Sequence, residues 1–311
     1  MSGSTEQLSR KISGAKDLGG VVRAMKALAA SSVGQYEKAV NALDDYLQTV
    51  ELGLIACLHG KGKDFPTGDL KPRHSEKIGA VIFGSDQGLV GSFNEVIVDF
   101  SLKTLRALPG KVTQIWVVGE RAKASLAETG GSSVRGLEVP ASLDAITPLV
   151  GQILLELQAA REKGEIWEVH VFHNHPKPSS AYEPVGRRLL PLDAAWEQKL
   201  HATPWPTKTP PQVIDGVSSA FPILIRDYLF VLLFQACAES LASENASRLA
   251  SMSRAEKSID SMLDDLNRKY HRLRQESIDE ELFDVIAGFE ALTRKHTAAT
   301  SRVAGERGKL Q

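Results

Sequence analysis

The 311-residue sequence contains only two cysteines, Cys57 and Cys237, which lie far apart in the chain. They form neither a CxxC pair nor the closely spaced even set of a disulfide framework, so the pattern is typical of a protein in a reducing compartment. Charge of one sign is not in excess either, since 38 acidic residues face 37 basic ones. The charge balance therefore gives no reason to expect nucleic acid or an anionic membrane as the main partner.

Long apolar runs are also missing. The most apolar run, 228–238, is shorter than the ~20 residues that a membrane-spanning helix needs, and residues 1–10 lack the apolar stretch of a secretory signal. We therefore expect no direct membrane insertion. The hydrophobic content of 42% is enough for a sizeable core in one or two domains.

Proline is absent from residues 12–58, where apolar residues recur at spacings of three and four. This pattern predicts one helix of ~70 Å with a heptad seam, and the adjacent Gly19 and Gly20 predict a bend or a weak point within it. The seam positions are Val33, Tyr36, Val40, Leu43, Leu47, Val50 and Leu54.

A second long helix is predicted from about residue 223, after Pro222, to about residue 292, a length of ~100 Å. Two such seams, one at each end of the chain, can bury each other as a long antiparallel coiled coil. The second seam consists of Met252, Ala255, Ile259, Met262, Leu266, Tyr270 and Leu273.

The middle of the chain alternates between β-prone runs at 78–83, 114–118 and 166–172 and helix-prone segments at 94–108, 121–128 and 143–163. Alternation of this kind predicts a Rossmann-like α/β domain with a largely parallel sheet. Residues 176–222 are rich in proline and are predicted to form an extended surface segment. The predicted organisation is a coiled-coil helix at 1–60, an α/β domain at 61–222, a coiled-coil helix at 223–292 and a flexible basic tail at 293–311.

Four stretches, in this order, resemble the gamma subunit of F-type ATP synthases. They are RAMKALAAS at 23–31, GSDQGLVGSFN at 84–94, ESLASENASRLASM at 239–252 and RQESIDEELFDVIAGFEAL at 274–292. Gln87 and Val90 stand where the family commonly has a basic residue and a cysteine, and many members end near the position of Leu292. These departures indicate a divergent bacterial branch.

The resemblance implies a central rotor shaft that couples ion-driven rotation of a membrane c-ring to conformational cycling of catalytic beta subunits. Such a subunit performs no catalysis and needs no cofactor. Its implied partners are the alpha and beta subunits, an epsilon-type subunit and the c-ring, with no nucleic acid. Its implied place is peripheral, at the cytoplasmic face of the bacterial inner membrane. The resemblance does not determine the coupling ion, or whether synthesis or hydrolysis dominates.

The family's functional positions fall in three groups of residues. In the alternative interpretation, the basic coupling residues are only solvated charges on the flanks of the coiled coil and Met25 is core. The groups implied by the resemblance are Met25, Lys26, Arg248, Arg274 and Gln275 for coupling to the beta subunits, Ile278, Leu282, Ile286 and Phe289 for an apolar bearing contact, and Gly84, Asp86, Gly88 and Gly91 for a structural loop.

Two other features have the context of a ligand site. Gly84, Gly88 and Gly91 follow a strand and precede a helix, but their spacing matches neither GxGxxG nor GxxxxGK[ST], and a tight turn explains them equally well. His173 and His175, near His170, share a face of one predicted strand as two metal ligands would, but no cysteine lies nearby to complete the set. We therefore expect no metal site and no catalytic residues.

Two rival interpretations remain open from the residues alone. One is a small-molecule enzyme built on the α/β domain, which would bind a nucleotide or metal as an isolated chain. The other is an unrelated coiled-coil scaffold, which would form stable homodimers through its exposed seam.

Overall fold

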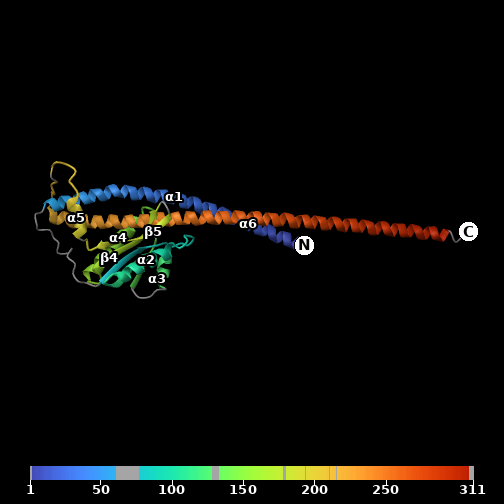
Figure 1. Cartoon of the computed structure of the whole chain (residues 1–311), viewed down its shortest axis with the longest axis horizontal. Coiled ribbons are helices and arrows are strands. Elements are labelled where there is room, and N and C mark those ends of the chain that lie inside the picture. Colours follow the sequence, from blue (N-terminus) through green and yellow to red (C-terminus); the bar gives the residue numbers. More distant parts are fainter. Residues whose placement is uncertain are drawn as a thin grey trace. The chain divides into compact units, whose positions relative to one another are not determined.

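The computed structural model describes residues 2–60, 77–127, 133–177, 180–192, 194–209, 211–214 and 216–307 (Figure 1). The chain divides into two compact units, Met1–Ala24 with Arg254–Gln311, and Met25–Ser253. The two long helices, α1 (Ser2–Gly60) and α6 (Val217–Arg307), contribute to both units, and the second unit also contains the sheet.

The sheet has five strands in the order β3-β2-β1-β4-β5. Neighbouring strands are parallel except β4 and β5, which are antiparallel, so the predicted largely parallel α/β sheet is confirmed. Its strands are β1 (Lys77–Phe83), β2 (Lys111–Val118), β3 (Ser133–Leu137), β4 (Glu168–Lys177) and β5 (Ser180–Leu190). The shorter helices are α2 (Phe93–Ala107), α3 (Glu120–Ala127), α4 (Ile146–Glu162) and α5 (Ala194–Ala202).

The side chains of the strands alternate between two apolar cores. On β1, Ile78, Ala80 and Ile82 face the core that α2 and α3 complete. Val81 and Phe83 face the larger core, to which α1, α4 and α6 contribute. Because both faces are covered, β1 is buried at every position after Lys77, as expected for the central strand of a parallel sheet.

Within Met25–Ser253, α1 and α6 pack together in antiparallel directions. Gly53 approaches Leu224 so closely that a Cβ at this glycine would lie 3.0 Å from a leucine methyl carbon. Tyr36, which precedes Gly53 on α1, is near Glu244, which follows Leu224 on α6. The predicted coiled-coil pairing of the two terminal helices is confirmed, and the first seam is buried or half-buried throughout.

The apolar part of α6 packs against the sheet in the same unit. By length and composition α6 qualifies as a possible membrane span, with a window of mean hydropathy 1.7. Tyr228, Leu232, Leu233 and Leu241 are nevertheless buried in the larger core. Packing inside the unit thus buries part of this apolar segment, since 33% of the window is buried.

In the other unit, Ile12, Ala15 and Val22 of α1 and Ile259 of α6 are buried. A Cβ at Gly19 would lie 3.5 Å from the Ile259 methyl carbon, so the glycine allows close approach of the helices. The helix α1 remains α-helical through Gly19 and Gly20. The second seam is less regular than predicted, because Met262 is 52% exposed while its neighbour Leu263 is half-buried.

The segment 176–222 differs from the prediction of an extended surface segment. It contains β5, which pairs with β4, and α5, whose Leu200 is buried in the larger core. The prediction was wrong because Pro184 and Gly186 interrupt the β pattern of an edge strand, where proline is tolerated. The helix α6 also begins at Val217, with Pro222 inside it, and continues to Arg307.

Candidate functional site at the glycine loop, the serine face and the helix ends

The loop after β1 leads into α2. Hydrogen bonds hold this loop to the sheet and to the start of α2. The Ser85 backbone N–H donates to Asn94 Oδ1 over 2.9 Å, and the Asn94 amide donates to Ser85 Oγ over 2.9 Å. The Gly84 N–H donates to the Val118 carbonyl. These donors are therefore engaged inside the protein, which favours a structural turn over a phosphate-binding loop at this position.

The first and last glycines of the loop are needed for different reasons. Close packing requires a glycine at Gly84, and the backbone conformation favours a glycine at Gly91. A Cβ at Gly84 would lie 2.3 Å from the Ala122 Cβ, which no rotation could relieve, so α3 can approach β1 only at a glycine. Gly91 has φ +61°, the left-handed region that glycine adopts without strain. Gly88 lies between them and is half-buried.

Asp86 ties this loop to two other segments. Its Oδ1 accepts the Glu120 N–H at 2.8 Å, at the start of α3, and its Oδ2 accepts the Val139 N–H at 3.1 Å, just after β3. A carboxylate at a helix N-terminus is also favoured by the helix dipole. One side chain thus fixes the ends of three connections at the carboxyl edge of the sheet.

Three serines of α6, Ser240, Ser243 and Ser247, form a row that we call the serine face. Ser247 Oγ donates to the Val90 carbonyl over 2.6 Å and Ser243 Oγ to the Asn174 carbonyl over 2.9 Å. Ser240 Oγ makes a longer bond of 3.5 Å to the Phe83 carbonyl. All three are buried, and their spacing of three and four places them on one side of the helix. The serine face joins α6 to the glycine loop and to the sheet.

Arg248 lies next to the serine face in a nearly buried ion pair. Its Nη2 donates to Glu244 Oε1 over 2.6 Å, and its Nη1 donates to Asn245 Oδ1. Burial raises the pKa of Glu244, the Arg248 charge lowers it, and nearby Asp86 raises it further, with a net increase above the ordinary value. Arg248 is thus partly neutralised within the chain.

The other coupling residues lie at different places along the helices. Met25 and Lys26 are half-buried on α1 within Met25–Ser253, the unit that also contains Arg248. Arg274 and Gln275 are exposed on α6 in the other unit. Three of the five residues therefore belong to one unit and two to the other.

The proposed bearing residues form an apolar stretch on exposed helix. The side chains of Ile278, Leu282, Ile286 and Phe289 are between 46% and 70% exposed. Phe283 and Val285, which sequence reasoning did not include, are exposed to a similar degree. Apolar surface of this extent on consecutive helical turns is typical of an interaction site.

One group of potential metal ligands is present among the described residues. His173 and His175 of β4 both contact Glu239 of α6, while His170 pairs separately with Glu168 over 2.7 Å. Sequence reasoning considered the histidines but missed Glu239, because 64 residues or more separate the carboxylate from them. No local spacing could have found it.

Two long terminal helices that pair with each other and an α/β domain formed by the middle of the chain define the class as an α/β protein with paired terminal helices. Comparison with known proteins identifies the family to which the chain belongs. Residues 4–292 match the family model described as ATP synthase. The chain belongs to this family, and within it is a distant homologue of the gamma chain.

The curated relatives are similar over almost their whole length. The ATP synthase gamma chains of Nitrosococcus oceani and Polynucleobacter asymbioticus are 26% and 25% identical over 294 residues, covering 93% of this chain and 99% of each relative. The gamma subunit is the non-catalytic rotor subunit in the central stalk of F-type ATP synthase, and this is the function of the chain.

Solved structures share the fold. A chain of the Euglena gracilis mitochondrial ATP synthase, in a structure of OSCP, F1 and c-ring in rotational state 3, superposes with a TM-score of 0.61 and 16% identity, covering 94% of this chain and 95% of that one. A chain from the central stalk and c-ring of the Tetrahymena thermophila mitochondrial enzyme gives a TM-score of 0.51 with 20% identity, covering 76% of this chain and 99% of that one.

Proposed function

We propose that this rotor subunit acts on the catalytic beta subunits through Met25, Lys26, Arg248, Arg274 and Gln275. Rotation would present these side chains to each beta subunit in turn and bias its conformational equilibrium, with the angle of the stalk as the effector. Arg248 already pairs with Glu244. A beta-subunit carboxylate meeting Arg248 would therefore share the guanidinium with Glu244 rather than meet an unpaired cation.

The apolar stretch at Ile278, Leu282, Ile286 and Phe289 is proposed to turn in an apolar bearing formed by the ring of alpha and beta subunits. The observation that carries this proposal is its exposure, since four large apolar side chains within twelve residues are each about half or more exposed. Burial in a ring would remove this surface from water, which stabilises the complex by ~25 cal/mol for each Å² of apolar surface buried.

The remaining partners are proposed from the family. The α/β domain would bind an epsilon-type subunit and sit on the membrane c-ring, and the complex would be peripheral to the cytoplasmic face of the bacterial inner membrane. The chain would then reach the membrane through these partners. No nucleic acid and no cofactor is proposed to take part.

Co-expression of the chain with the alpha, beta and epsilon subunits of the same organism tests this proposal. One copy among three alpha and three beta subunits by native mass, with ATP turnover dependent on the chain, is the expected result. A chain that joins no such ring and purifies as a stable homodimer would contradict the proposal and favour a coiled-coil scaffold.

The coupling residues are tested in the same complex. The double variant Arg274→Ala and Gln275→Ala should assemble normally but lower ATP turnover, because both side chains are exposed and contribute little to the fold. Arg272→Ala is the matched control. Arg272 is an exposed arginine on the same helix, and its side chain pairs with Glu276. Equal turnover of the double variant and the control would remove these two residues from the coupling path.

A further inference from the structure

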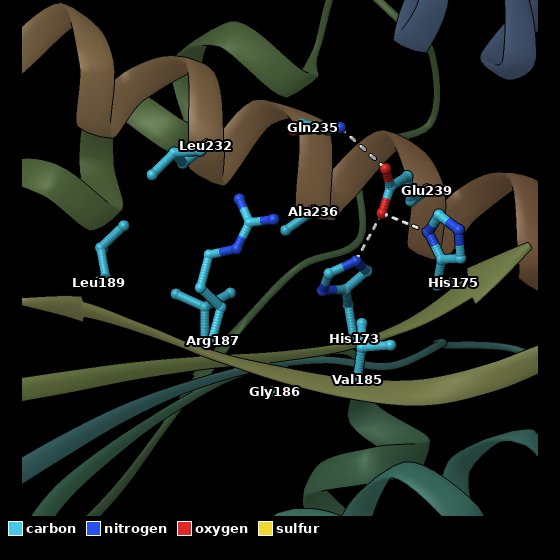
Figure 2. Close-up of a pocket in the computed structure, with 11 residues that line it drawn as sticks. His173, His175, Val185, Gly186, Arg187, Leu189, Leu232, Gln235, Ala236 and Glu239 are labelled. Atoms are coloured by element: carbon cyan, nitrogen blue, oxygen red, sulfur yellow. Dashed lines mark hydrogen bonds and ion pairs between the residues drawn. The ribbon is translucent and has the colours of Figure 1, made fainter. Parts of the chain in front are cut away.

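The group formed by His173, His175 and Glu239 joins β4 to α6 at one point. His173 Nε2 lies 2.6 Å and His175 Nδ1 lies 2.9 Å from the same carboxylate oxygen, Glu239 Oε2 (Figure 2). The two histidines are two residues apart on one strand, so they project from the same face of the sheet. The three potential ligand atoms lie within 4.8 Å of one another.

The carboxylate is held in place by a further contact. Gln235, one turn earlier on α6, donates its Nε2–H to the other carboxylate oxygen, Glu239 Oε1, over 3.0 Å (Figure 2). Such an outer contact orients a ligating group and leaves Oε2 directed at the histidines.

The group lines a cavity of about 320 Å³, to which β4, β5 and α6 contribute. Glu239 and His173 are nearly buried, with 7% and 11% of their side chains exposed, whereas His175 is 46% exposed and gives access from solvent. Arg187 of β5 also lines the cavity (Figure 2). Its positive charge would favour a small anion at an open coordination position, and it would weaken the binding of a cation by repulsion.

We propose that His173, His175 and Glu239 form a binding site for a divalent transition-metal cation, with Zn²⁺ as the expected ion, which clamps the rotor helix α6 to the sheet. Two imidazoles and one carboxylate are a ligand set that Zn²⁺ accepts with one position left for water. Nitrogen ligands of this kind disfavour Mg²⁺ and Ca²⁺, which prefer oxygen.

The two nitrogen-to-oxygen contacts require only small side-chain movements, and the two histidine nitrogens, which lie within 4.8 Å of each other, would also have to adopt the spacing of bound ligands. In a tetrahedral zinc site with bonds of about 2.0–2.1 Å, the ligand atoms lie about 3.3 Å apart. The nitrogen-to-oxygen distances of 2.6 and 2.9 Å would open by less than about 1 Å when the ion replaces the hydrogen-bonded protons. His173 Nδ1 has no hydrogen-bond partner among the described residues. Without that outer contact the affinity should be lower than in a fully supported site.

Zinc titration of the full-length chain, by equilibrium dialysis against a competing chelator, tests the site. We expect one Zn²⁺ per chain and a rise in Tm of several degrees at saturating zinc, because an ion that binds only the folded chain stabilises it. Co²⁺ in place of Zn²⁺ should give the visible absorption of a tetrahedral nitrogen and oxygen site. The absence of one tight equivalent would overturn the proposal.

Variants separate this site from adventitious surface binding. His175→Ala changes a half-exposed residue, so the chain should fold, and it should weaken zinc binding at least tenfold. Glu239→Gln should abolish both binding and the Tm rise. His170→Gln is the matched control on the same strand, because His170 pairs with Glu168 outside the group. Zinc binding that survives His175→Ala, or that His170→Gln removes equally, would contradict the assignment, and neither result depends on rotor function.

Discussion

Asp86 connects the loop after β1 to two other segments of the chain. Its two carboxylate oxygens accept backbone N–H groups from the start of α3 and from the residues after β3. Replacing Asp86 by alanine leaves two donors without their acceptor. We therefore expect Asp86→Ala to lower the free energy of unfolding by about 1–3 kcal/mol in urea denaturation.

Asp99→Ala is the control for Asp86→Ala. Asp99 is exposed on α2, so its replacement should change the free energy of unfolding by no more than about 0.5 kcal/mol. Equal effects of the two substitutions would show that the Asp86 hydrogen bonds do not stabilise the fold.

The raised pKa of Glu244 leads us to expect that the free energy of unfolding depends on pH. Its raised pKa, caused first by burial, means that the folded chain holds this proton more tightly than the unfolded chain does. The charged or titratable groups around it are Arg248 on the same helix, Asp86 of the loop, Tyr36 of α1 and Cys237. The stability linked to this proton is complete below the ordinary value of 4.5 and is lost as the pH rises through the higher folded value.

The variant Glu244→Gln carries no such proton. Its stability relative to the unmodified chain should therefore increase as the pH is raised from about 4.5 towards neutrality, since only the unmodified chain loses the linked stability. Urea denaturation of both chains at several pH values measures the difference. A constant difference across this range would show that Glu244 titrates equally in the folded and unfolded chains.

At the scale of elements, the serine face predicts how α6 is held to the sheet. Ser243→Ala and Ser247→Ala each remove a hydroxyl donor from a buried carbonyl, at a cost of about 1 kcal/mol each. Their acceptors belong to different segments, so the double variant should cost about 2 kcal/mol. Ser258→Ala, on an exposed part of α6, should cost less than about 0.5 kcal/mol. Urea denaturation of the four variants checks this order, which a double variant as stable as Ser258→Ala would contradict.

The elements that the sequence predicted well are those with a strong local pattern. Heptad spacing and the absence of proline predicted α1, and short apolar runs predicted β1, β2 and β4. By contrast, β5 was missed because an edge strand tolerates Pro184, and its pairing with β4 depends on contacts distant in the sequence. The second seam shifted at Met262 because an exact heptad repeat drifts on an α-helix of 3.6 residues per turn.

The candidate sites were predictable to the extent that they are local. The glycine loop follows β1 directly, so its residues could be named from the sequence, whereas the acceptors of the Ser243 and Ser247 hydroxyls lie 69 and 157 residues away. The partner of the two histidines, Glu239, was also out of reach of any spacing rule. Sequence alone therefore predicted the loop and the helices other than α5, but not α5 itself or the contacts that join α6 to the sheet.

At the scale of the whole molecule, the rotor function predicts a contrast between the isolated chain and the assembled complex. Leu282 and Ile286 are about half exposed on α6, one turn apart, so charges at these positions should leave the isolated chain stable. In the complex, the same charges would be buried against an apolar bearing, where an unpaired charge is costly.

The double variant Leu282→Asp and Ile286→Asp should therefore keep its helical circular dichroism and Tm as an isolated chain, but should lower the yield of complex with alpha and beta subunits at least tenfold. Asp284→Asn is the control, since Asp284 is exposed on the same helical turn and its replacement adds no charge. A double variant that assembles as well as this control would place the apolar stretch outside the ring. A lower Tm of the double variant as an isolated chain would instead show that these side chains stabilise the helix itself.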